Sequence, residues 1–394
     1  MIKEKLTNVI SKLESGARPK GEIVFENGIP SIGGEHLDKN GGFNFSNVRY
    51  ISKKYFESLS KGLVLKDDIL IVKDGATTGK VCFVSTNFPF KNATINEHVF
   101  KLEIDSKKAF AKYVFYYLFS EKGQNDIMKD FRGATIGGIS RSFSDKVFFP
   151  LPPLPEQKRI ATILDKADAL RQKNKQLLAA YDELLQATFL DMFGDPVTNP
   201  KGWEKERLYR IAKLERGRFS PRPRNDPSYF NGIYPFIQTG DISKSGNRLD
   251  SYSQTLNEKG IKVSKLFIKG TIVIAIVGAT IGATAILKID VYATDSIIGI
   301  SVNQEVANNV FLEFVMQFWK PILLKNAPEA ARANINLDIL GTLDIIAPPI
   351  ALQNQFSQIT ENIEAQKAIL KQSIQESEDL FNGLVQKAFN GELS

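Results

Sequence analysis

The sequence predicts an α+β protein with two homologous mixed α/β domains, each with a β-rich core. Two long antiparallel coiled-coil helices are expected to join these domains in a pseudo-twofold arrangement. Three observations lead to this prediction. The chain contains the same unit twice. Each copy consists mainly of short β-branched runs separated by glycine, asparagine and aspartate turns. Each copy is followed by a long segment whose apolar residues recur at heptad spacing.

The duplication is clearest in two matching segments. Residues 63–80 read LVLKDDILIVKDGATTGK, and residues 266–283 read LFIKGTIVIAIVGATIGA, so both contain the motif Gly-Ala-Thr-x-Gly. Further matches follow in the same order, namely 14–19 (ESGARP) with 215–221 (ERGRFSP), Pro30-Ser31-Ile32 with Pro235-Phe236-Ile237, Ile139-Ser140 with Ile335-Asn336, and Gln157 with Gln353. A collinear repeat of roughly 200 residues indicates a duplicated domain, not a solenoid of short repeats.

The first domain, residues 1–152, opens with a stretch predicted to be an amphipathic helix, MIKEKLTNVISKLESG, and has a second helical stretch near 107–123. Residues 195–349 repeat the mixed pattern. Within them, 271–287 carry no charge and approach the length of a membrane span. Their counterpart, 68–85, contains four charged residues, so we expect two buried strands around a turn at both places.

The segments 153–194 and 350–394 are predicted to be long helices. Pro155 suits the first turn of a helix. The predicted seam residues are Ile160, Ile163, Ala167, Leu170, Asn174, Leu177, Tyr181 and Leu184 in the first segment, and Phe356, Ile359, Ile363, Gln366, Leu370, Ile374, Leu380 and Leu384 in the second. Ordinary packing against the domains is the alternative. Because the order is domain, helix, domain, helix, we expect an antiparallel pair in which Asn174 and Gln366 fix the register.

Composition limits the possible functions. The formal net charge of +7 is compatible with nucleic-acid binding. Cys82 is the only cysteine, which excludes an intrachain disulfide and suits the reducing cytoplasm. With only His36 and His98 beside it, a zinc site is not expected. The amino-terminal segment lacks the apolar core of a signal peptide.

Three segments resemble catalytic motifs without matching them. Gly75–Lys80 is one residue too short for a phosphate-binding loop, and valine follows where serine or threonine is needed. Asn87-Phe88-Pro89-Phe90 has the wrong second residue for an adenine methyltransferase, and no glycine-rich cofactor loop precedes it. Glu156-Gln157-Lys158 has nuclease-like spacing but stands at a helix start, where glutamate is favourable. We therefore expect a chain that is not an enzyme.

Basic and polar residues gather in loops at equivalent places in both copies. The candidate DNA contacts are Arg18, Lys20, Lys73, Thr77, Lys80, Arg132 and Arg141 in the first copy, and Arg216, Arg218, Arg222, Arg224, Lys244, Thr280, Arg332 and Asn334 in the second. Arginine and asparagine suit bidentate readout of guanine and adenine. Lysines are better suited to neutralising phosphates. A solvated charge explains any one of these residues equally well, and the threonines suit a structural role in their turns.

Two proline-rich segments complete the pattern. Pro150–Gln157 reads PLPPLPEQ and Ala347–Gln355 reads APPIALQNQ, and each leads into a long helix. With the Gly-Ala-Thr-x-Gly turns and the ESGARP-like openings, these segments make the whole chain resemble the specificity (S) subunits of type I restriction–modification systems. Leu352 departs from the pattern, since it stands where the first copy has Glu156. Any charge contact at that position is therefore in doubt, although the helix is not.

The resemblance implies two target recognition domains, 1–152 and 195–349, each contacting one part of a bipartite DNA sequence. It implies that helical spacers 153–194 and 350–394 set the distance between the parts and dock two copies of a methyltransferase (M) subunit. A restriction/translocase (R) subunit would join that core. S-adenosylmethionine and ATP would be bound by the partner subunits, with no cofactor and no active site in this chain.

Three alternatives remain open at this point. The chain could be the specificity subunit of a related type II or phage-exclusion methylation system, which neighbouring coding sequences would reveal. It could be a structural coiled-coil adaptor without DNA contact, which would bind no DNA in the assembled complex. A protein with its own restriction or methylation chemistry is disfavoured because the corresponding motifs are missing.

Overall fold

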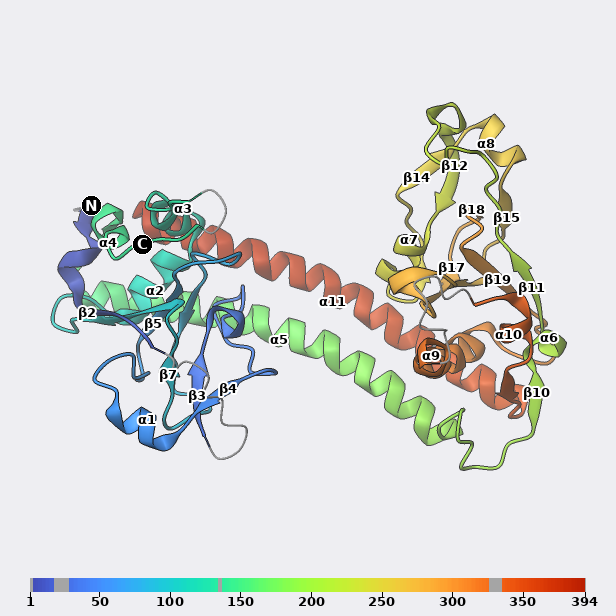
Figure 1. Cartoon of the computed structure of the whole chain (residues 1–394), viewed down its shortest axis with the longest axis horizontal. Helices are drawn as coiled ribbons and strands as arrows, with labels where there is room; N and C mark the ends of the chain where they lie inside the picture. Colours follow the sequence, from blue (N-terminus) through green and yellow to red (C-terminus); the bar gives the residue numbers. More distant parts are fainter. Residues whose placement is uncertain (1–2, 18–27, 134–136, 326–334, 394) are drawn as a thin grey trace. The chain divides into compact units, whose positions relative to one another are not determined.

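The computed structural model describes residues 3–17, 28–133, 137–325 and 335–393. The chain forms two compact units: Met1–Gln176 with Lys371–Ser394, and Leu177–Leu370. Two long helices, α5 (Leu154–Phe193) and α11 (Ile350–Asn390), each contribute one half to each unit (Figure 1). The segment predicted as 153–194 is therefore helical to within one residue at either end.

The first unit contains three small sheets among its described residues. The largest has the order β2 (Ile10–Ser15), β8 (Val99–Ile104), β5 (Ile69–Val72) and β6 (Val81–Phe83), with antiparallel neighbours. The second has the order β4 (Arg49–Ile51), β3 (Ile29–Ile32) and β7 (Thr94–Ile95), and the third pairs β1 (Lys3–Lys5) with β9 (Phe148–Pro150). Its short helices are η1 (Leu6–Val9), η2 (Gly34–His36), α1 (Lys53–Ser58), α2 (Ala111–Phe119), α3 (Glu121–Met128) and α4 (Phe143–Lys146).

The second unit repeats this plan. Its largest sheet has the order β11 (Ala212–Arg216), β19 (Ile297–Val302), β16 (Ile272–Ala275), β17 (Thr284–Leu287) and β13 (Arg248–Leu249). The others are β14 (Gln254–Leu256), β12 (Phe230–Ile237), β18 (Val291–Ala293) and β15 (Lys265–Phe267), and the pair β10 (Lys205–Arg207) and β20 (Asp344–Ile346). Its short helices are α6 (Leu208–Ile211), η3 (Pro227–Tyr229), α7 (Thr239–Lys244), α8 (Glu258–Lys262), η4 (Gly278–Thr280), α9 (Asn309–Lys325) and α10 (Leu337–Gly341).

Strand pairing confirms the duplication at the level of single residues. Ser31 pairs with Thr94 in a parallel ladder, and Phe236 pairs with Tyr292 in the equivalent ladder of the second unit. Leu70 lies opposite Lys101, and Val273 lies opposite Gly299. These partners fall where the sequence repeat places them. The predicted fold class is therefore confirmed for each unit.

The backbone geometry explains why certain glycines are present in both copies. A Cβ on Gly16 would lie 1.7 Å from the carbonyl oxygen of Ile95, and a Cβ on Gly217 would lie 2.1 Å from that of Thr294. Gly75 and Gly278 open the Gly-Ala-Thr-x-Gly turns with φ of 92° and 68°, a left-handed conformation that suits glycine. Close approach and turn geometry thus explain why these residues occur in both copies.

A shared glutamine locks each domain to the helix that follows it. The amide oxygen of Gln157 accepts the Phe110 N–H (2.8 Å), and its amide nitrogen donates to the carbonyl oxygen of Pro152 (2.7 Å). Gln353 makes the same two bonds with Asn308 (2.9 Å) and Pro348 (2.7 Å). Both glutamines are buried. The proline-rich signature therefore acts as a hydrogen-bonded junction between domain and helix.

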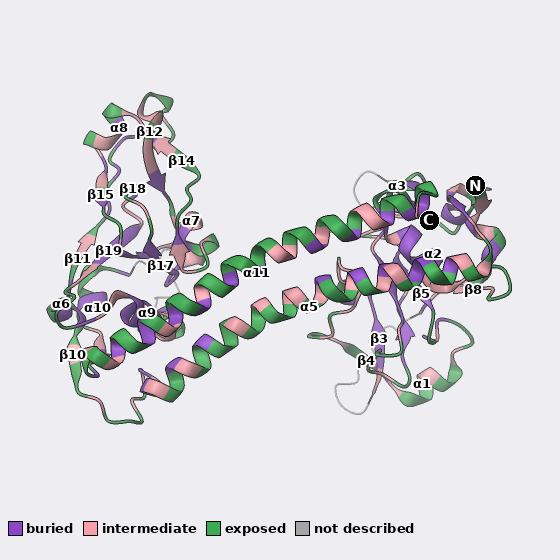
Figure 2. Cartoon of the chain, turned by 180° about the vertical axis from the view of Figure 1, so that it is seen from behind, coloured by how far each residue is buried: buried purple, intermediate pink, exposed green. Residues whose placement is uncertain are grey.

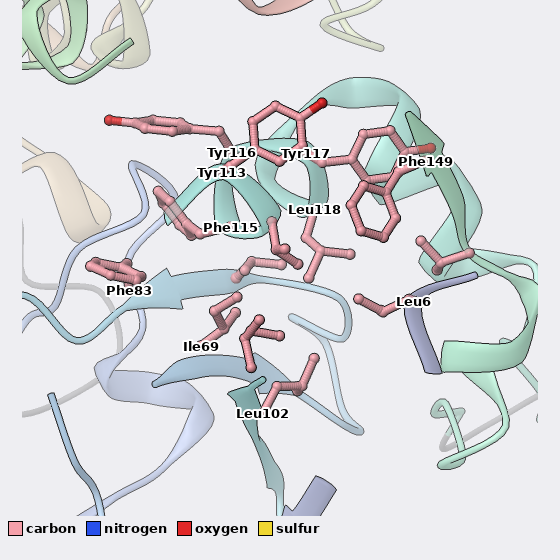
Figure 3. Packing of buried hydrophobic residues seen from close by; sticks show 14 of the residues in the cluster. Leu6, Ile69, Phe83, Leu102, Tyr113, Phe115, Tyr116, Tyr117, Leu118 and Phe149 are labelled. Atoms are coloured by element: carbon pink, nitrogen blue, oxygen red, sulfur yellow. The ribbon is translucent and has the colours of Figure 1, made fainter. Parts of the chain in front are cut away.

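Each core is completed by both long helices. In the first unit, Tyr113, Tyr117 and Phe149 lie together in the core (Figure 3). Phe389 of α11 packs against the two tyrosine rings, and Leu164 of α5 belongs to the same cluster. In the second unit, Phe189 and Phe193 of α5 pack with Phe311 and with Phe356 of α11. Figure 2 shows these purple buried positions recurring along helices whose other faces are exposed. Within each unit the two helices run antiparallel.

The seam of α5 differs from the prediction by one column. Leu170, Leu177 and Leu184 are 43–48% exposed, whereas Leu164 and Leu185 are buried. Arg171 occupies the intervening seam position at 5% exposure. Its guanidinium lies 4.5 Å from the ring centroid of Phe381 and 3.1 Å from Glu378. Because Arg171 is charged, the sequence pattern did not identify it as a seam residue. The neighbouring leucine column was predicted in its place.

The register residues were predicted with mixed success. Asn174 reaches across to α11, where its amide nitrogen lies 3.3 Å from the carbonyl oxygen of Ser373. Gln366 is exposed, contrary to the prediction. Its neighbour Lys367 is buried instead, and its ammonium pairs with Asp182 of α5 at 2.7 Å. A polar contact therefore crosses the seam in each unit. Asn174 makes it in the first unit, and the Lys367–Asp182 ion pair makes it in the second.

The amino-terminal prediction was wrong. The stretch expected to be one amphipathic helix forms β1, η1 and β2. Leu6 and Val9 are buried through the 3-10 turn, and Ile10 and Leu13 face the core from a strand paired with β8. Apolar residues three and four apart suit a helix, but pairing with β8 overrides that local pattern.

The uncharged segment 271–287 forms β16, η4 and β17, as predicted from its charged counterpart. Both strands are buried along their whole length. Among the described residues, no helix is both long and apolar enough to cross a membrane.

Candidate nucleic-acid interface

In the first unit, three loops meet at one edge of the main sheet. The turn after β5 is joined to the glycine-rich loop of residues 133–140 by the Gly75 N–H, which donates to the carbonyl oxygen of Gly137 (3.2 Å). The Lys73 N–H donates to the carbonyl oxygen of His98 in the β7–β8 loop (2.8 Å). Ile139 donates back to the carbonyl oxygen of Lys73 (2.8 Å). Lys73, Thr77 and Arg132 are therefore brought to neighbouring loops.

The charges at this edge are paired yet accessible. The Lys73 ammonium lies 3.5 Å from the carboxylate of Asp74, which also pairs with the ring of His98. The side chains of Lys73 and His98 are 34% and 48% exposed. Exposed pairs of this kind add little stability. They do keep the cations at the surface in defined positions.

A buried aspartate holds the base of the glycine-rich loop. Asp130 accepts the N–H of Ser140 (2.8 Å) and pairs with Lys146 (2.6 Å) and Arg132 (3.3 Å). Burial opposes ionisation, but the hydrogen bonds from Lys146 and Ser140 outweigh it and lower the pKa of Asp130 well below its ordinary value. Arg132 remains 70% exposed above this anchor, and Arg141 is exposed at the other end of the loop.

The equivalent edge of the second unit gathers two of the predicted arginines. The Arg216 Nε donates to the main-chain oxygen of Asp295 (2.6 Å), and the Arg224 guanidinium lies 2.8 Å from the carboxylate of Asp295. Asp295 lies in the β18–β19 loop, beside Ser296, whose carbonyl oxygen accepts the Ile276 N–H at the end of β16 (3.1 Å). Two arginines that are distant in sequence from Asp295 thus converge on it, beside the Gly-Ala-Thr turn.

Two other arginines mainly hold main-chain carbonyl groups. Arg218 donates to the carbonyl oxygens of Lys262 (3.3 Å) and Ser264 (3.1 Å). Arg222 donates to that of Pro221 (2.7 Å) in its own loop. Both side chains belong to exposed residues, so they order the loop while keeping donors at its surface.

The remaining described candidates make contacts within their own unit. Lys80 donates to the carbonyl oxygen of Leu37 (3.2 Å). Thr280 donates to the carbonyl oxygen of Val277 (3.2 Å), which is a structural turn contact. Lys244 is exposed at the end of α7, a helix that lies beside η4. Asn336, the counterpart of Ser140 in the sequence repeat, uses its amide oxygen to cap α10 through the Ile339 N–H (2.8 Å).

Four candidates, Arg18, Lys20, Arg332 and Asn334, lie outside the described residues. The acidic residues Asp130 and Asp295 were missed by sequence reasoning. Acidic residues gave no signal of their own, since only the folded chain shows which basic side chains they face.

The segments that resembled catalytic motifs have structural partners. Glu156 pairs with Arg159 on the first turn of α5 (2.7 Å). Phe88 and Phe90 belong to a ring cluster with Phe43 and Phe45. Within the described part of the chain, no group of three or more histidine, cysteine, aspartate or glutamate residues is placed to hold a metal.

Comparisons with known proteins identify the family of the chain. The family model described as "Type I restriction modification DNA specificity domain" matches residues 4–180 and again 200–378. The type I restriction enzyme EcoBI specificity subunit of Escherichia coli is 24% identical over 441 aligned residues, covering 100% of this chain and 90% of that protein. The MjaIX specificity subunit of Methanocaldococcus jannaschii is 28% identical over 234 residues. That match covers 55% of this chain and about half (51%) of the relative.

Solved structures support the fold. The S subunit of a type I restriction–modification system from M. genitalium has a TM-score of 0.60 at 16% identity, covering 98% of this chain and 96% of that one. A chain from a structure concerned with complex assembly and conformational transition of the type I R-M system has a TM-score of 0.59 at 16% identity, covering 100% and 98%. At this identity the likeness concerns the fold alone.

Proposed function

Because the chain belongs to the family of type I restriction modification DNA specificity domains, we propose that it is the sequence-specific DNA-recognition subunit of a type I restriction–modification complex. One observation carries this proposal: two copies of one framework place basic side chains at the same edge of the main sheet. The framework is shared while the loop residues differ. Two such modules suit a DNA site with two different parts.

We assign residues 1–152 and 195–349 to the two target recognition domains. The proposed contacts are Arg18, Lys20, Lys73, Thr77, Lys80, Arg132 and Arg141 for one part of the site, and Arg216, Arg218, Arg222, Arg224, Lys244, Thr280, Arg332 and Asn334 for the other. The exposed guanidinium of Arg132 is the best supported in the first set, because Asp130 anchors its loop. Lysines would more often neutralise phosphates and arginines would more often reach base edges, although both side chains can contact guanine.

We propose that the helical segments 153–194 and 350–394 act as spacers and dock two methyltransferase (M) subunits. The exposed column Leu170, Leu177 and Leu184 on α5 supports this, because exposed leucines at heptad spacing suit the face of another helix. A restriction/translocase (R) subunit would join the complex. In this assignment the chain is not catalytic, S-adenosylmethionine and ATP are bound by its partners, and the complex works in the cytoplasm.

Mapping of methylated bases tests the proposal. Cells expressing this chain with its methyltransferase should carry a bipartite methylated motif that is absent without the chain. Replacing both Arg132 and Arg141 with alanine should degrade one part of the motif and leave the other part and the spacer unchanged, since each unit reads separately.

Lys12→Ala is a control within the same unit, because Lys12 of β2 is exposed and pairs with Glu103 (3.7 Å) near the end of β8 that lies away from the β7–β8 loop. It should leave the motif intact. Absence of any bipartite motif beside an active methyltransferase, or equal loss of both parts in the double variant, would contradict modular readout.

A further inference from the structure

Two acidic residues occupy the same place in the two units. Glu97 lies in the loop between β7 and β8, and Asp295 lies in the loop between β18 and β19. In each unit the strand before the loop pairs in parallel with β3 or β12, and the strand after it joins the main sheet. Neither residue stood out in the sequence.

Each acidic residue holds two basic side chains by the same two means. Its main-chain oxygen accepts one of them: Lys73 Nζ at 3.2 Å from Glu97, and Arg216 Nε at 2.6 Å from Asp295. Its carboxylate faces the other: His98 Nε2 at 3.4 Å from Glu97, and Arg224 Nη2 at 2.8 Å from Asp295. In the first unit Asp74 shares this role, since it also pairs with Lys73 (3.5 Å) and with His98 Nδ1 (2.5 Å). The pattern of contacts is duplicated although the basic residues are different and come from different elements.

These contacts restrict the orientation of the basic side chains but leave some of their hydrogen-bond donors available. Arg224 is 51% exposed and bonds the carboxylate through one nitrogen, which leaves further guanidinium donors for another partner. A long basic side chain that is already oriented loses less rotamer freedom when it binds. Orientation also favours bidentate contact with a base edge over undirected attraction to phosphates.

Asp295 occupies its position at an energetic cost. Its Oδ1 is buried and has no hydrogen-bond partner among the described residues. A buried oxygen without a partner destabilises the fold. A negative charge beside a DNA interface also weakens attraction to phosphates. Both penalties are expected if the carboxylate improves discrimination between DNA sequences at the expense of stability and of affinity for DNA in general.

We propose that Glu97 and Asp295 are duplicated positioning residues, each of which orients the basic side chains that read one part of the DNA site. This inference rests on the proposed recognition function. Glu97 serves the first unit through Lys73 and His98, and Asp295 serves the second through Arg216 and Arg224. Neither carboxylate needs to touch DNA itself.

The test uses the complex assembled with its methyltransferase. Glu97→Gln and Asp295→Asn remove a charge with little change in size. Binding is measured to the full site, to sites with one part scrambled, and to unrelated DNA. Asp295→Asn should reduce discrimination at one part by about tenfold, the lower end of what a good bidentate contact provides. Glu97→Gln should do the same at the other part, and affinity for unrelated DNA should hold or rise in both variants.

Controls separate positioning from folding. Asp295→Glu keeps the charge and should retain most discrimination. Glu305→Gln changes a charge beyond the opposite end of β19 and should change nothing. Arg224→Gln, on an exposed loop, should lose the same discrimination as Asp295→Asn, and the double variant should lose little more, because both act through one contact.

Unchanged discrimination in both acid variants, or full discrimination with Arg224→Gln, would overturn the positioning role. A variant could instead lose discrimination, lose affinity for unrelated DNA and melt at a lower temperature. That combination would show a merely structural role and would also overturn the positioning role. If the wild-type complex binds the scrambled sites as tightly as the full site, the proposed recognition function is wrong, and this inference is wrong with it.

Discussion

The main sheets of the two units have equivalent strands but fill one interior position in opposite ways. In the first unit, Lys101 of β8 is 3% exposed and its ammonium lies 3.4 Å from the buried carboxylate of Asp68. In the second unit the same strand position is Gly299, where a Cβ would lie 2.5 Å from the ring of Phe267. An ion pair in one copy is thus replaced by a phenylalanine ring over glycine in the other.

The reverse exchange occurs beside the helix that follows. The first unit packs Phe115 of α2 against Phe83 of β6, with ring centroids 5.5 Å apart. In the second unit, α9 carries a fully buried glutamate, Glu313, that accepts the Thr284 hydroxyl (2.8 Å) and lies 3.5 Å from Arg248. Equivalent helix–strand contacts are therefore apolar in one copy and polar in the other.

This difference shows what defines the framework. The residues that match in both copies stand where the backbone needs them, as Gly16 and Gly217 do at close approaches and Gln157 and Gln353 at the helix junctions. Interior side chains changed while volume and pairing were satisfied in another way. A framework held by turns and junctions leaves the loops free to read different sequences.

The largest expected effect comes from breaking the ion pair of the first unit. Lys101→Met leaves Asp68 buried without its partner and should lower the free energy of unfolding by about 3–5 kcal/mol. Hydrogen exchange followed by mass spectrometry should locate the loss in the first unit, with the second unit unchanged.

Lys101→Met combined with Asp68→Asn is the matched control and should cost less than the sum of the single changes. If Lys101→Met lowers the free energy of unfolding by less than about 1 kcal/mol, or equally in both units, the ion pair does not stabilise the first unit specifically.

A smaller effect tests the equivalence of the junctions. Gln157→Ala and Gln353→Ala each remove two hydrogen bonds and leave the N–H of Phe110 or Asn308 without its acceptor. Each should cost about 1–3 kcal/mol of its own unit's stability, because a half-buried donor loses its partner. Denaturant unfolding with hydrogen exchange should give similar losses for the two variants. A loss in only one of them would mean that the junctions are not equivalent.

The effect with the smallest change per measured step is a slope of the first unit's stability with pH. Burial raises the pKa of Asp68 to about 6 from an ordinary 3.8, although the Leu65 N–H and Lys101 oppose this rise. Between these values the folded chain keeps a proton that the unfolded chain has released. The free energy of unfolding of the first unit should therefore fall as pH rises from about 4 to about 6.

Asp68→Asn should remove that slope in exchange experiments on first-unit peptides. The equivalent residue of the second unit, Thr271, does not titrate, although burial also raises the pKa of Glu313 there. A slope that persists in the first unit after Asp68→Asn would assign it to another group.

Much of the fold was predictable from the sequence. The repeat located the strands on both sides of the Gly-Ala-Thr turns, and the signature segments located both long helices. The seam was not predictable, because Arg171 and Lys367 look like surface residues until a carboxylate on the neighbouring helix neutralises them. The amino-terminal segment was mispredicted because strand pairing with β8 decides its conformation.

The candidate interface was predictable in its loops but not in its contacts. Arg216 and Arg224 were expected at the surface, and they are there. That one acidic residue gathers them depends on a main-chain oxygen and a carboxylate brought close by β18 and β19. Such convergence has no local pattern in the sequence.

The two units differ in how they are threaded along the chain, and this sets the order in which a ribosome can complete them. The second unit is one continuous stretch, Leu177–Leu370, whereas the first needs Lys371–Ser394 as well as Met1–Gln176. Phe389 must reach the first core before Tyr113 and Tyr117 are covered, and Phe381 must do the same for Tyr116. The unit whose synthesis begins first therefore cannot complete its core until Lys371–Ser394 has been translated, after every residue of the second unit.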